Sequence, residues 1–233
     1  MLTSFAPSNR QAAPALQGLP IQGLRMNGAE ATQSSRPGPT GTTLHFAQDQ
    51  EIYCESDEAN LFFKVVSGVV RTCKFLYDGR RQIDAFHSEG DVFGVEASAE
   101  YSYSAEAVCD CTLVSYRRQE MDVSALEDTG FYRQLFSYAM RSVARAQGHA
   151  LLLGRKSALE KVVAFLLDWA RHSTDNEMIV LAMTRQDIAD YLGLTIETVS
   201  RTLSLLERDG VIGLMSARQI RIIRPATLQA LNS

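Results

Sequence analysis

Apolar residues occur in short runs, separated by turn-forming residues, from Leu44 to about Tyr116. Asp78-Gly79 lies between two such runs and predicts a β-hairpin, because this dipeptide readily adopts the tight turn that joins antiparallel strands. Ser67-Gly68 and Gly90-Asp91 predict two more turns. Closely spaced strands of this kind are typical of a small antiparallel barrel or a double-sheet roll.

The pattern becomes helical over residues 122–154, where small and apolar residues recur at a heptad-like spacing. One interpretation is packing against the chain's own β-domain, and we expect part of the helix to pack there. A long helix with a second apolar edge is explained more simply by pairing with a second copy of the chain, so we predict a dimerisation helix. The predicted interface residues are Phe136, Ala139, Val143, Ala146, Ala150 and Leu153.

A domain boundary is predicted where this helix ends. Gly154 favours the helix end, and Ser157 with Glu160 forms the capping-box pattern of a new helix that extends to Arg171. Residues 1–43 are rich in Ala, Pro, Gly, Ser, Thr and Gln without an apolar period, which predicts a flexible segment. The predicted parts are therefore a flexible tail (1–43), a β-roll (44–121), a dimerisation helix (122–154) and a C-terminal domain (155–233).

Two short helices joined by a tight turn are predicted from Thr184 onward. Thr184 and Asp187 form a capping box at the start of the first helix. Gly193 ends that helix, and Thr195 caps the next one. Two helices joined by a short turn that contains Gly are typical of the helix-turn-helix motif.

The second of these helices has two chemically different faces. Ile196, Val199, Leu203 and Leu206 fall on one side and predict packing on the first helix. The opposite side carries Glu197, Ser200, Arg201, Ser204 and Arg208. An ordinary amphipathic surface helix would also show polar residues here. However, Arg has a planar fork that matches guanine and Glu can accept from cytosine, so the pattern favours a helix that reads the DNA major groove.

A second hairpin is predicted after this helix, between Val211–Met215 and Gln219–Ile223, as the wing of a winged helix. Arg218 and Arg221 are candidates for phosphate contacts, although solvated strand charges would look the same. We predict Glu197, Ser200 and Arg201 as base-reading residues. The predicted supporting or phosphate-contacting residues are Thr195, Thr198, Ser204, Arg208, Arg218 and Arg221.

The charge distribution agrees with DNA binding although the whole chain carries a net charge of −4. Five of the Arg residues lie within Arg201–Arg224, against only Glu207 and Asp209. A basic face on an acidic chain is typical of a DNA-binding module joined to a regulatory module.

The chain resembles the Crp/Fnr regulators, and most of all the FixK-type members of nitrogen-fixing bacteria. The resemblance is carried by Glu197-x-x-Ser200-Arg201, which matches the Fnr-type reading motif, and by Arg185–Leu194, which matches the preceding helix. It extends to Lys64–Arg71, Gly90–Gly94 and Leu152–Ser157.

The resemblance implies an α+β fold with an N-terminal antiparallel β-roll of cyclic-nucleotide-binding type, a long dimerisation helix and a C-terminal winged helix-turn-helix. It further implies a homodimer that activates transcription from a palindrome of TTGA…TCAA type in double-stranded DNA. A role in microaerobic or nitrogen-fixation genes and contact with RNA polymerase are also implied. No secretory signal and no apolar run long enough to span a membrane is evident, so we expect a cytoplasmic protein with no membrane partner.

Several cofactors known in the family are not expected here. Relatives that bind cyclic nucleotides supply an Arg to the phosphate, whereas this chain has no Lys or Arg between Arg81 and Arg117. Glu96, Glu100 and Glu106 would instead repel a phosphate. Activity without a small-molecule effector or cofactor is therefore predicted.

Iron–sulfur and haem sensing remain open as alternatives. Iron–sulfur relatives place most ligands near the N-terminus, whereas here the four Cys are at 54, 73, 109 and 111. Cys109 and Cys111 are two apart on a predicted strand and would share a face, as a metal or redox pair or simply as buried residues. His45 or His87 could ligate haem, or a nitric-oxide sensor could share this fold. A cupin-like enzyme would need closely spaced His ligands such as His-x-His, which the chain lacks, so we predict that it is not an enzyme.

Overall fold

The computed structural model describes residues 41–119, 129–171 and 177–232, with side chains from residue 136 onward in the long helix. The predicted flexible tail lies almost wholly outside these residues, and so does the start of the predicted dimerisation helix.

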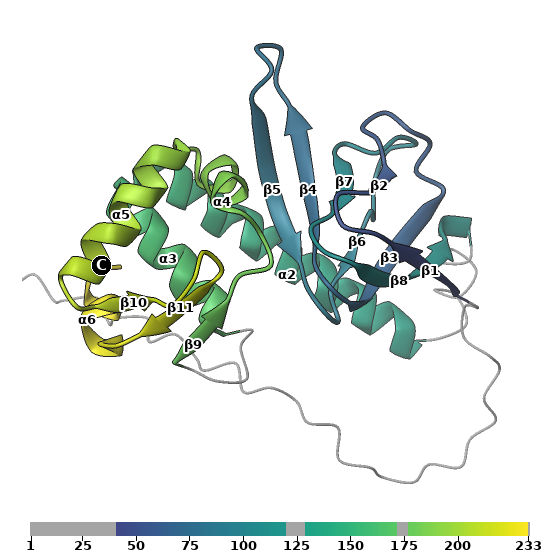
Figure 1. Ribbon diagram of the computed structural model, residues 1–233. Coiled ribbons are helices and arrows are strands. Elements are labelled where there is room, and N and C mark those ends of the chain that lie inside the picture. Colours follow the sequence, from purple (N-terminus) through teal and green to yellow (C-terminus); the bar gives the residue numbers. More distant parts are fainter. Residues whose placement is uncertain (1–40, 120–128, 172–176, 233) are drawn as a thin grey trace, which may run out of the picture. The chain divides into compact units, whose positions relative to one another are not determined.

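Eight strands form the N-terminal roll, in two antiparallel sheets (Figure 1). The strands are β1 (Thr42–Phe46), β2 (Glu51–Tyr53), β3 (Leu61–Ser67), β4 (Val70–Phe75), β5 (Arg81–His87), β6 (Val92–Phe93), β7 (Ser104–Ala107) and β8 (Cys111–Arg117). One sheet has the order β1-β8-β3-β6 and the other β2-β7-β4-β5. The chain thus enters the roll at Thr42, two residues before the expected start at Leu44.

The predicted turns of the roll are confirmed. Gly68, Gly79 and Gly90 all have positive φ, between 82° and 87°, which a side chain would disfavour. Gly79 lies at the tip of the hairpin between β4 and β5, which pair in antiparallel register from Val70–His87 to Phe75–Arg81. The Gly79 turn joins two strands that pair with each other, whereas Gly68 and Gly90 lie where the chain passes from one sheet to the other. The two sheets enclose one apolar core.

Helices and short strands make up the rest of the chain: α2 (Thr129–Arg155), α3 (Ala158–Ala170), β9 (Met178–Val180), α4 (Arg185–Leu192), α5 (Ile196–Arg208), β10 (Ile212–Leu214), β11 (Gln219–Ile222) and α6 (Pro225–Ala230). The predicted capping box of Ser157 and Glu160 is confirmed at the start of α3. The prediction that Gly154 ends the long helix is wrong, because α2 continues through Gly154 to Arg155.

The predicted wing is confirmed and gains a third strand. β10 and β11 pair in antiparallel register, with Ile220 and Ile222 buried and Gln219 and Arg221 exposed, as their alternation predicts. β9 pairs with the other edge of β11. A three-residue strand carries too little pattern to be distinguished from a loop in the sequence.

The C-terminal core is shared between the two domains. Phe165 and Leu166 from α3 pack with the inward residues of α4, α5 and the wing. Val69 and Val108 of the roll belong to the same buried cluster, and Phe86 of β5 packs against it. The roll and the helix-turn-helix therefore bury apolar surface against each other.

A substitution at Leu203 tests the packing of α5, because the Leu203 side chain is only 2% exposed. Leu203→Ala is expected to lower the free energy of unfolding by about 2–5 kcal/mol, since it leaves a cavity in the core. Ile196→Ala on the same helix should change it by less than about 0.5 kcal/mol, because Ile196 is exposed. Urea denaturation measures both. Equal losses for the two variants would contradict this packing.

Candidate nucleic-acid interface

The two helices of the helix-turn-helix have the capping residues that were predicted from the sequence. Thr184 accepts a hydrogen bond from the Asp187 amide, and the Asp187 carboxylate accepts from the Thr184 amide, which completes the capping box of α4. Gly193 ends α4 in the left-handed conformation with φ of 60°. The Thr195 hydroxyl then accepts from the Thr198 amide and starts α5. The turn between the helices is therefore only three residues long, from Gly193 to Thr195.

The inner face of α5 is confirmed with one correction. Val199, Leu203 and Leu206 are buried, as predicted. Ile196 was predicted to pack inward, but its side chain is 37% exposed. It occupies the first position of the helix, where the chain has only just turned away from α4. Thr202 is buried instead, and its hydroxyl donates to the Thr198 carbonyl at 2.8 Å, so this polar group is satisfied inside the helix.

The outer face of α5 carries the predicted reading residues. Glu197, Arg201, Ser204 and Arg208 are exposed, and Ser200 is partly buried. Ser200, Arg201, Ser204, Leu205 and Arg208 lie together on an open part of this face. Polar groups of both donor and acceptor type thus lie side by side on a single helix, which is the chemistry that base edges in a major groove require.

Glu197 is held in the ionised state. Its own backbone amide, the Thr195 hydroxyl and the charge of Arg201 lower the pKa of its carboxyl, against a small opposing effect of burial. Arg201 lies one helical turn after Glu197, so the two side chains can support each other on the exposed face. The pair therefore presents one acceptor and one donor side by side.

The predicted supporting residues lie around this face. Thr195 and Thr198 are at the N-terminus of α5, where their hydroxyl oxygens lie 3.0 Å apart. Arg218 and Arg221 are exposed on the wing, Arg218 directly before β11 and Arg221 within it. Arg224 differs from them: its guanidinium donates to the Gly210 carbonyl at 2.9 Å and so anchors the end of α5. The roles of these residues in DNA binding stay predictions.

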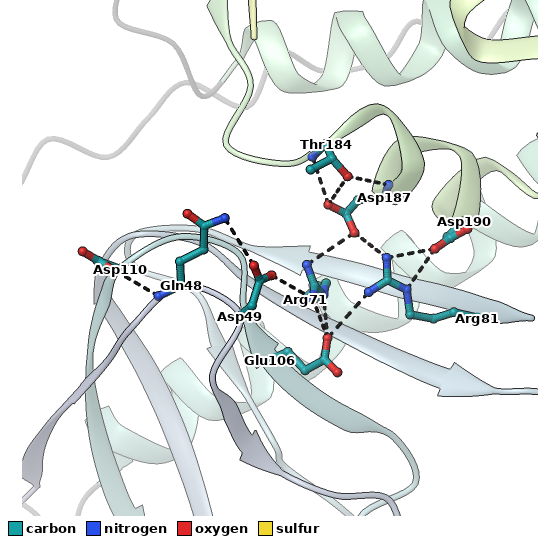
Figure 2. Close-up of polar contacts among 9 residues, drawn as sticks. All are labelled: Gln48, Asp49, Arg71, Arg81, Glu106, Asp110, Thr184, Asp187 and Asp190. Atoms are coloured by element: carbon teal, nitrogen blue, oxygen red, sulfur yellow. Dashed lines mark hydrogen bonds and ion pairs between the residues drawn. The ribbon is translucent and has the colours of Figure 1, made fainter. Parts of the chain in front are cut away.

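Ion pairs between the roll and α4 were not predicted (Figure 2). Arg71 on β4 and Arg81 at the start of β5 both donate to Oδ1 of Asp187, at 3.3 and 2.5 Å. Arg81 also donates to Asp190 at 2.9 Å. These contacts join residues more than 100 positions apart, so no local pattern in the sequence could reveal them.

Asp187 is charged in this setting. Burial alone would raise the pKa of its carboxyl, but hydrogen bonds from Thr184 and the charges of Arg71 and Arg81 outweigh burial and lower it. A carboxylate whose pKa is lowered in the folded protein stabilises the fold above its ordinary pKa, and this contribution is lost as the pH falls through the lowered value. The contacts are therefore complete at neutral pH.

The predicted dimer stripe on α2 is mostly exposed. Phe136 and Val143 are 61% and 49% exposed, unusually high for apolar side chains of this size. Met140 and Leu151, which the sequence analysis did not single out, are also exposed on α2. Tyr138 is buried, and Arg145 forms an ion pair with Asp91 of the roll at 3.2 Å. Phe136 also lines a cavity between α2 and the roll, whereas Met140, Val143 and Leu151 are exposed apolar residues of the helix that do not line it.

The other predicted interface residues divide in the same way. Ala139, Ala146 and Ala150 are exposed, whereas Leu153 is half buried. A Cβ atom at Gly193 would lie 3.4 Å from the Leu153 side chain, so Leu153 packs beside the turn after α4. Leu153 therefore has a contact within its own chain.

A cavity of about 550 Å³ lies between the roll and α2. Its lining includes Tyr53, Phe93, Asp84 and Glu96, and among the residues whose side chains the structure describes no Lys or Arg lines it. Of the three Glu expected to repel a phosphate, only Glu96 lines the cavity. Glu106 instead forms an ion pair with Arg71 at 2.7 Å, and the backbone of Glu100 forms an isolated β-bridge with that of Glu58. The cavity itself is acidic and aromatic.

His87 lines this cavity and is buried. Its Nε2 lies 3.1 Å from the Thr72 hydroxyl, and within the described part of the chain its Nδ1 is a buried side-chain nitrogen with no hydrogen-bond partner. Burial lowers the pKa of His87 from 6.5 to about 4, with Asp91 acting in the opposite direction and Arg145 in the same one. The imidazole is therefore neutral at pH 7.

The cysteines do not form the predicted pair on one strand. Cys109 lies in the bend before β8, and only Cys111 belongs to that strand. The two pack in different cores, Cys109 against the C-terminal cluster and Cys111 in the roll. Burial raises the pKa of the Cys73 and Cys111 thiols to about 11, and a hydrogen bond with Glu51 raises that of Cys54 to about 11. These three thiols are thus protonated and poor metal ligands or nucleophiles at neutral pH.

Within residues 41–119, 129–171 and 177–232, no three His, Cys, Asp or Glu side chains are grouped so that they could hold a metal ion. None of the helices described there has the length and apolar character needed to cross a membrane.

Comparison with known proteins agrees with both domains. The family of cyclic nucleotide-binding domains matches residues 43–125, and the Crp-like helix-turn-helix domain matches residues 160–231. The nitrogen fixation regulation protein FixK of Azorhizobium caulinodans is 46% identical over 215 residues, which cover 88% of this chain and 87% of that protein. FixK of Rhizobium meliloti is 41% identical, covering 78% of this chain and 83% of that protein.

A solved structure extends the comparison to three dimensions. FixK2 from Bradyrhizobium japonicum superimposes with a TM-score of 0.80 at 42% identity, covering 83% of this chain and 98% of that chain. The chain therefore belongs to the Crp/Fnr family of transcription regulators. Within that family it is of the FixK/Fnr type and carries a helix-turn-helix DNA-binding domain. Because these relatives are regulators, the prediction that the chain is not an enzyme is confirmed.

The buried His87 makes the stability of the roll depend on pH. Below pH 6.5 the unfolded chain takes up a proton at this site while the folded chain does not, so stability falls as the pH drops from 6.5 towards 4. The slope is about 1.4 kcal/mol per pH unit. His87→Gln should remove it, so that wild type loses about 2 kcal/mol more than the variant between pH 7 and pH 5.

Urea denaturation at several pH values measures this difference. His45→Gln is the matched control, because His45 is exposed, and it should keep the wild-type profile. A wild-type profile in His87→Gln would contradict the prediction.

Proposed function

We propose that the chain is a dimeric, sequence-specific activator that reads a palindrome of TTGA…TCAA type. The observation that carries this proposal is the outer face of α5, where Glu197 and Arg201 stand exposed one turn apart while Val199 and Leu203 anchor the opposite face. A rigidly anchored helix with a matched donor and acceptor is suited to reading base edges in the major groove.

Three side chains divide the reading of one half-site. Arg201 donates to a guanine, and Glu197 accepts from the cytosine of the opposite strand while it keeps Arg201 in line. Ser200 contacts a neighbouring base or a thymine methyl group. The supporting contacts, chiefly to phosphates, come from Thr195, Thr198, Ser204, Arg208, Arg218 and Arg221.

Dimerisation uses the exposed stripe of α2. Phe136 and Val143 are apolar, uncovered and on a helix that is otherwise docked on the roll. Pairing of two such helices would bury these side chains and bring two reading helices to about 34 Å apart, one turn of DNA. Each helix then reads one half of the palindrome.

Activity needs no small-molecule effector. The described lining of the cavity of the roll is acidic and aromatic and contains no Lys or Arg, so a cyclic nucleotide phosphate would find no basic partner among these residues. The FixK names of the relatives support a role in microaerobic or nitrogen-fixation genes. Contact with RNA polymerase through exposed loops, and action in the cytoplasm where the promoter DNA lies, complete the proposal.

A haem-sensing regulator of the same fold is the competing function. The observation in its favour is His87, whose buried Nδ1 has no hydrogen-bond partner among the residues that the structure describes and which lines a cavity of about 550 Å³. An absorption spectrum of the purified protein distinguishes the two functions, because bound haem would give an intense band in the visible range.

Arg201→Ala should weaken binding to the preferred palindrome by about 1–3 kcal/mol and relax discrimination at one G·C pair, because it removes a base contact. Arg221→Ala should weaken binding to all duplexes alike and reduce the salt dependence by about one counterion, because it removes a phosphate contact. Titrations on specific and random duplexes at several salt concentrations measure both.

The comparison between the two variants is the control. Equal losses for Arg201→Ala on specific and random duplexes would make it a phosphate contact and overturn the assignment of the reading helix. Addition of cyclic AMP to the wild-type titration should leave the affinity unchanged.

Val143→Glu should disrupt the dimer, because it places a charge in an apolar seam. Light scattering should show a shift towards the monomer, and DNA affinity should fall although α5 is intact. Ser137→Glu is the matched control, since Ser137 is exposed on another side of α2 and already accepts from Arg141. A dimeric Val143→Glu with normal DNA binding would show that the stripe is not the interface.

A further inference from the structure

Two arginines of the roll are directed at the first helix of the reading domain. Arg71 on β4 is only 7% exposed, and Arg81 begins the neighbouring strand β5 (Figure 2). Burial of a guanidinium is costly unless its donors are all paired, so the partners of these two side chains indicate what the arginines hold in place.

Asp187 accepts from both domains at once. Its Oδ2 accepts from the Thr184 amide and hydroxyl, at 2.9 and 2.7 Å, which caps α4. Its Oδ1 accepts from Arg71 and Arg81 of the roll. One carboxylate therefore fixes both the start of α4 and its position on the roll.

Further contacts follow along α4. Arg81 donates through Nε to Asp190 at 2.9 Å, almost one turn beyond Asp187. The Gln82 side chain donates to the Tyr191 carbonyl at 3.2 Å. Because consecutive residues of β5 hold successive positions of α4, the helix is constrained against rotation about its axis as well as against translation.

The roll braces the arginines from the other side. Glu106 on β7 accepts from Arg71 at 2.7 Å and lies 3.6 Å from Arg81, and Asp49 lies 3.2 Å from Arg71. The two guanidiniums thus stand between carboxylates of the roll and carboxylates of α4. An Arg fork held on both sides has little rotational freedom, which favours a single geometry.

Apolar contacts beside this cluster are less directional. Phe86 of β5 packs on Tyr191, Phe165 and Trp169, with ring centroids 5.4 to 6.4 Å apart. Such contacts hold two surfaces together but tolerate small slides, whereas hydrogen-bonded ion pairs do not. The polar cluster is therefore suited to setting the orientation rather than supplying the bulk of the stability.

We propose that Arg71 and Arg81 are positioning residues for DNA recognition, which hold α4, and through it the reading helix α5, at one orientation on the roll. The proposal rests on the proposed dimeric DNA-binding function. In a dimer, the orientation of each reading helix on its roll sets the distance between the two reading helices. Arg71 and Arg81 thereby determine which spacing between half-sites the dimer accepts, without touching DNA.

The experiment measures affinity of the full-length protein for the palindrome with its best-bound spacing, and for duplexes with one or two base pairs added or removed between half-sites. Wild type should lose about ten-fold or more when the spacing changes, because both helices no longer fit. Arg81→Gln should bind the best spacing more weakly and all spacings within about three-fold of one another. Affinity for a single half-site should remain at the wild-type value.

Two variants make the result specific. Arg80→Gln is the matched control: Arg80 is the adjacent residue, is exposed and pairs only locally with Asp78, so the wild-type spacing profile should persist. Asp190→Asn leaves the capping box of α4 intact and should flatten the profile as Arg81→Gln does. Adding Asp190→Asn to Arg81→Gln should change the profile little further, since Arg81→Gln already removes the contact with Asp190 together with the one to Asp187.

The outcomes separate the two proposals. If wild type binds no palindrome, the proposed function fails. If wild type discriminates between spacings, and the two variants Arg81→Gln and Asp190→Asn discriminate equally well, the positioning role is overturned. If Arg81→Gln does not fold, the profile of Asp190→Asn decides. A loss of half-site affinity in Asp190→Asn would mean that the cluster only stabilises the domain, and this too would overturn the proposal.

Discussion

The arrangement of the two domains depends on the hydrogen bonds and ion pairs that the Asp187 carboxylate forms. This carboxylate caps the first helix of the reading domain and accepts from two arginines of the β-roll. The first amides of a helix have no partners within it, and the Thr184 hydroxyl and the Asp187 carboxylate together complete the capping box of α4. The chain thus adds a second role to a group that already takes part in the local cap.

Asp187 lies at the boundary between the roll and the helix-turn-helix domain, and each side of this boundary leaves one surface exposed. On one side, the apolar face of α5 packs with α3, α4 and the wing, which leaves a polar face of Glu197, Ser200 and Arg201 outward. On the other side, α2 packs on the roll and leaves Phe136 and Val143 uncovered. In the proposed dimer the two surfaces need a defined angle between them, and the positioning role proposed for Arg71 and Arg81 lies at this boundary.

The roll keeps the cavity of its fold but not the chemistry of a phosphate site. Asp84, Glu96 and His87 lie among aromatic side chains, and the arginines that are buried in the roll, such as Arg71, are engaged with α4 instead. The same type of residue that could neutralise a ligand therefore serves the contact between domains. This division supports the proposed activity without a cyclic nucleotide.

Local chemistry determined what the sequence could predict by itself: the hairpin at Asp78-Gly79, the capping boxes at Ser157 and Thr184, and the two faces of α5 depend on residues within a few positions of one another. The tertiary structure alone decided where the side chains of Cys109 and Ile196 lie, because helix ends and bends place side chains where periodicity does not apply. It also decided the pairing of Arg71 and Arg81 with Asp187, since contacts across more than 100 residues arise only when separate elements fold together and leave no periodic trace in the chain.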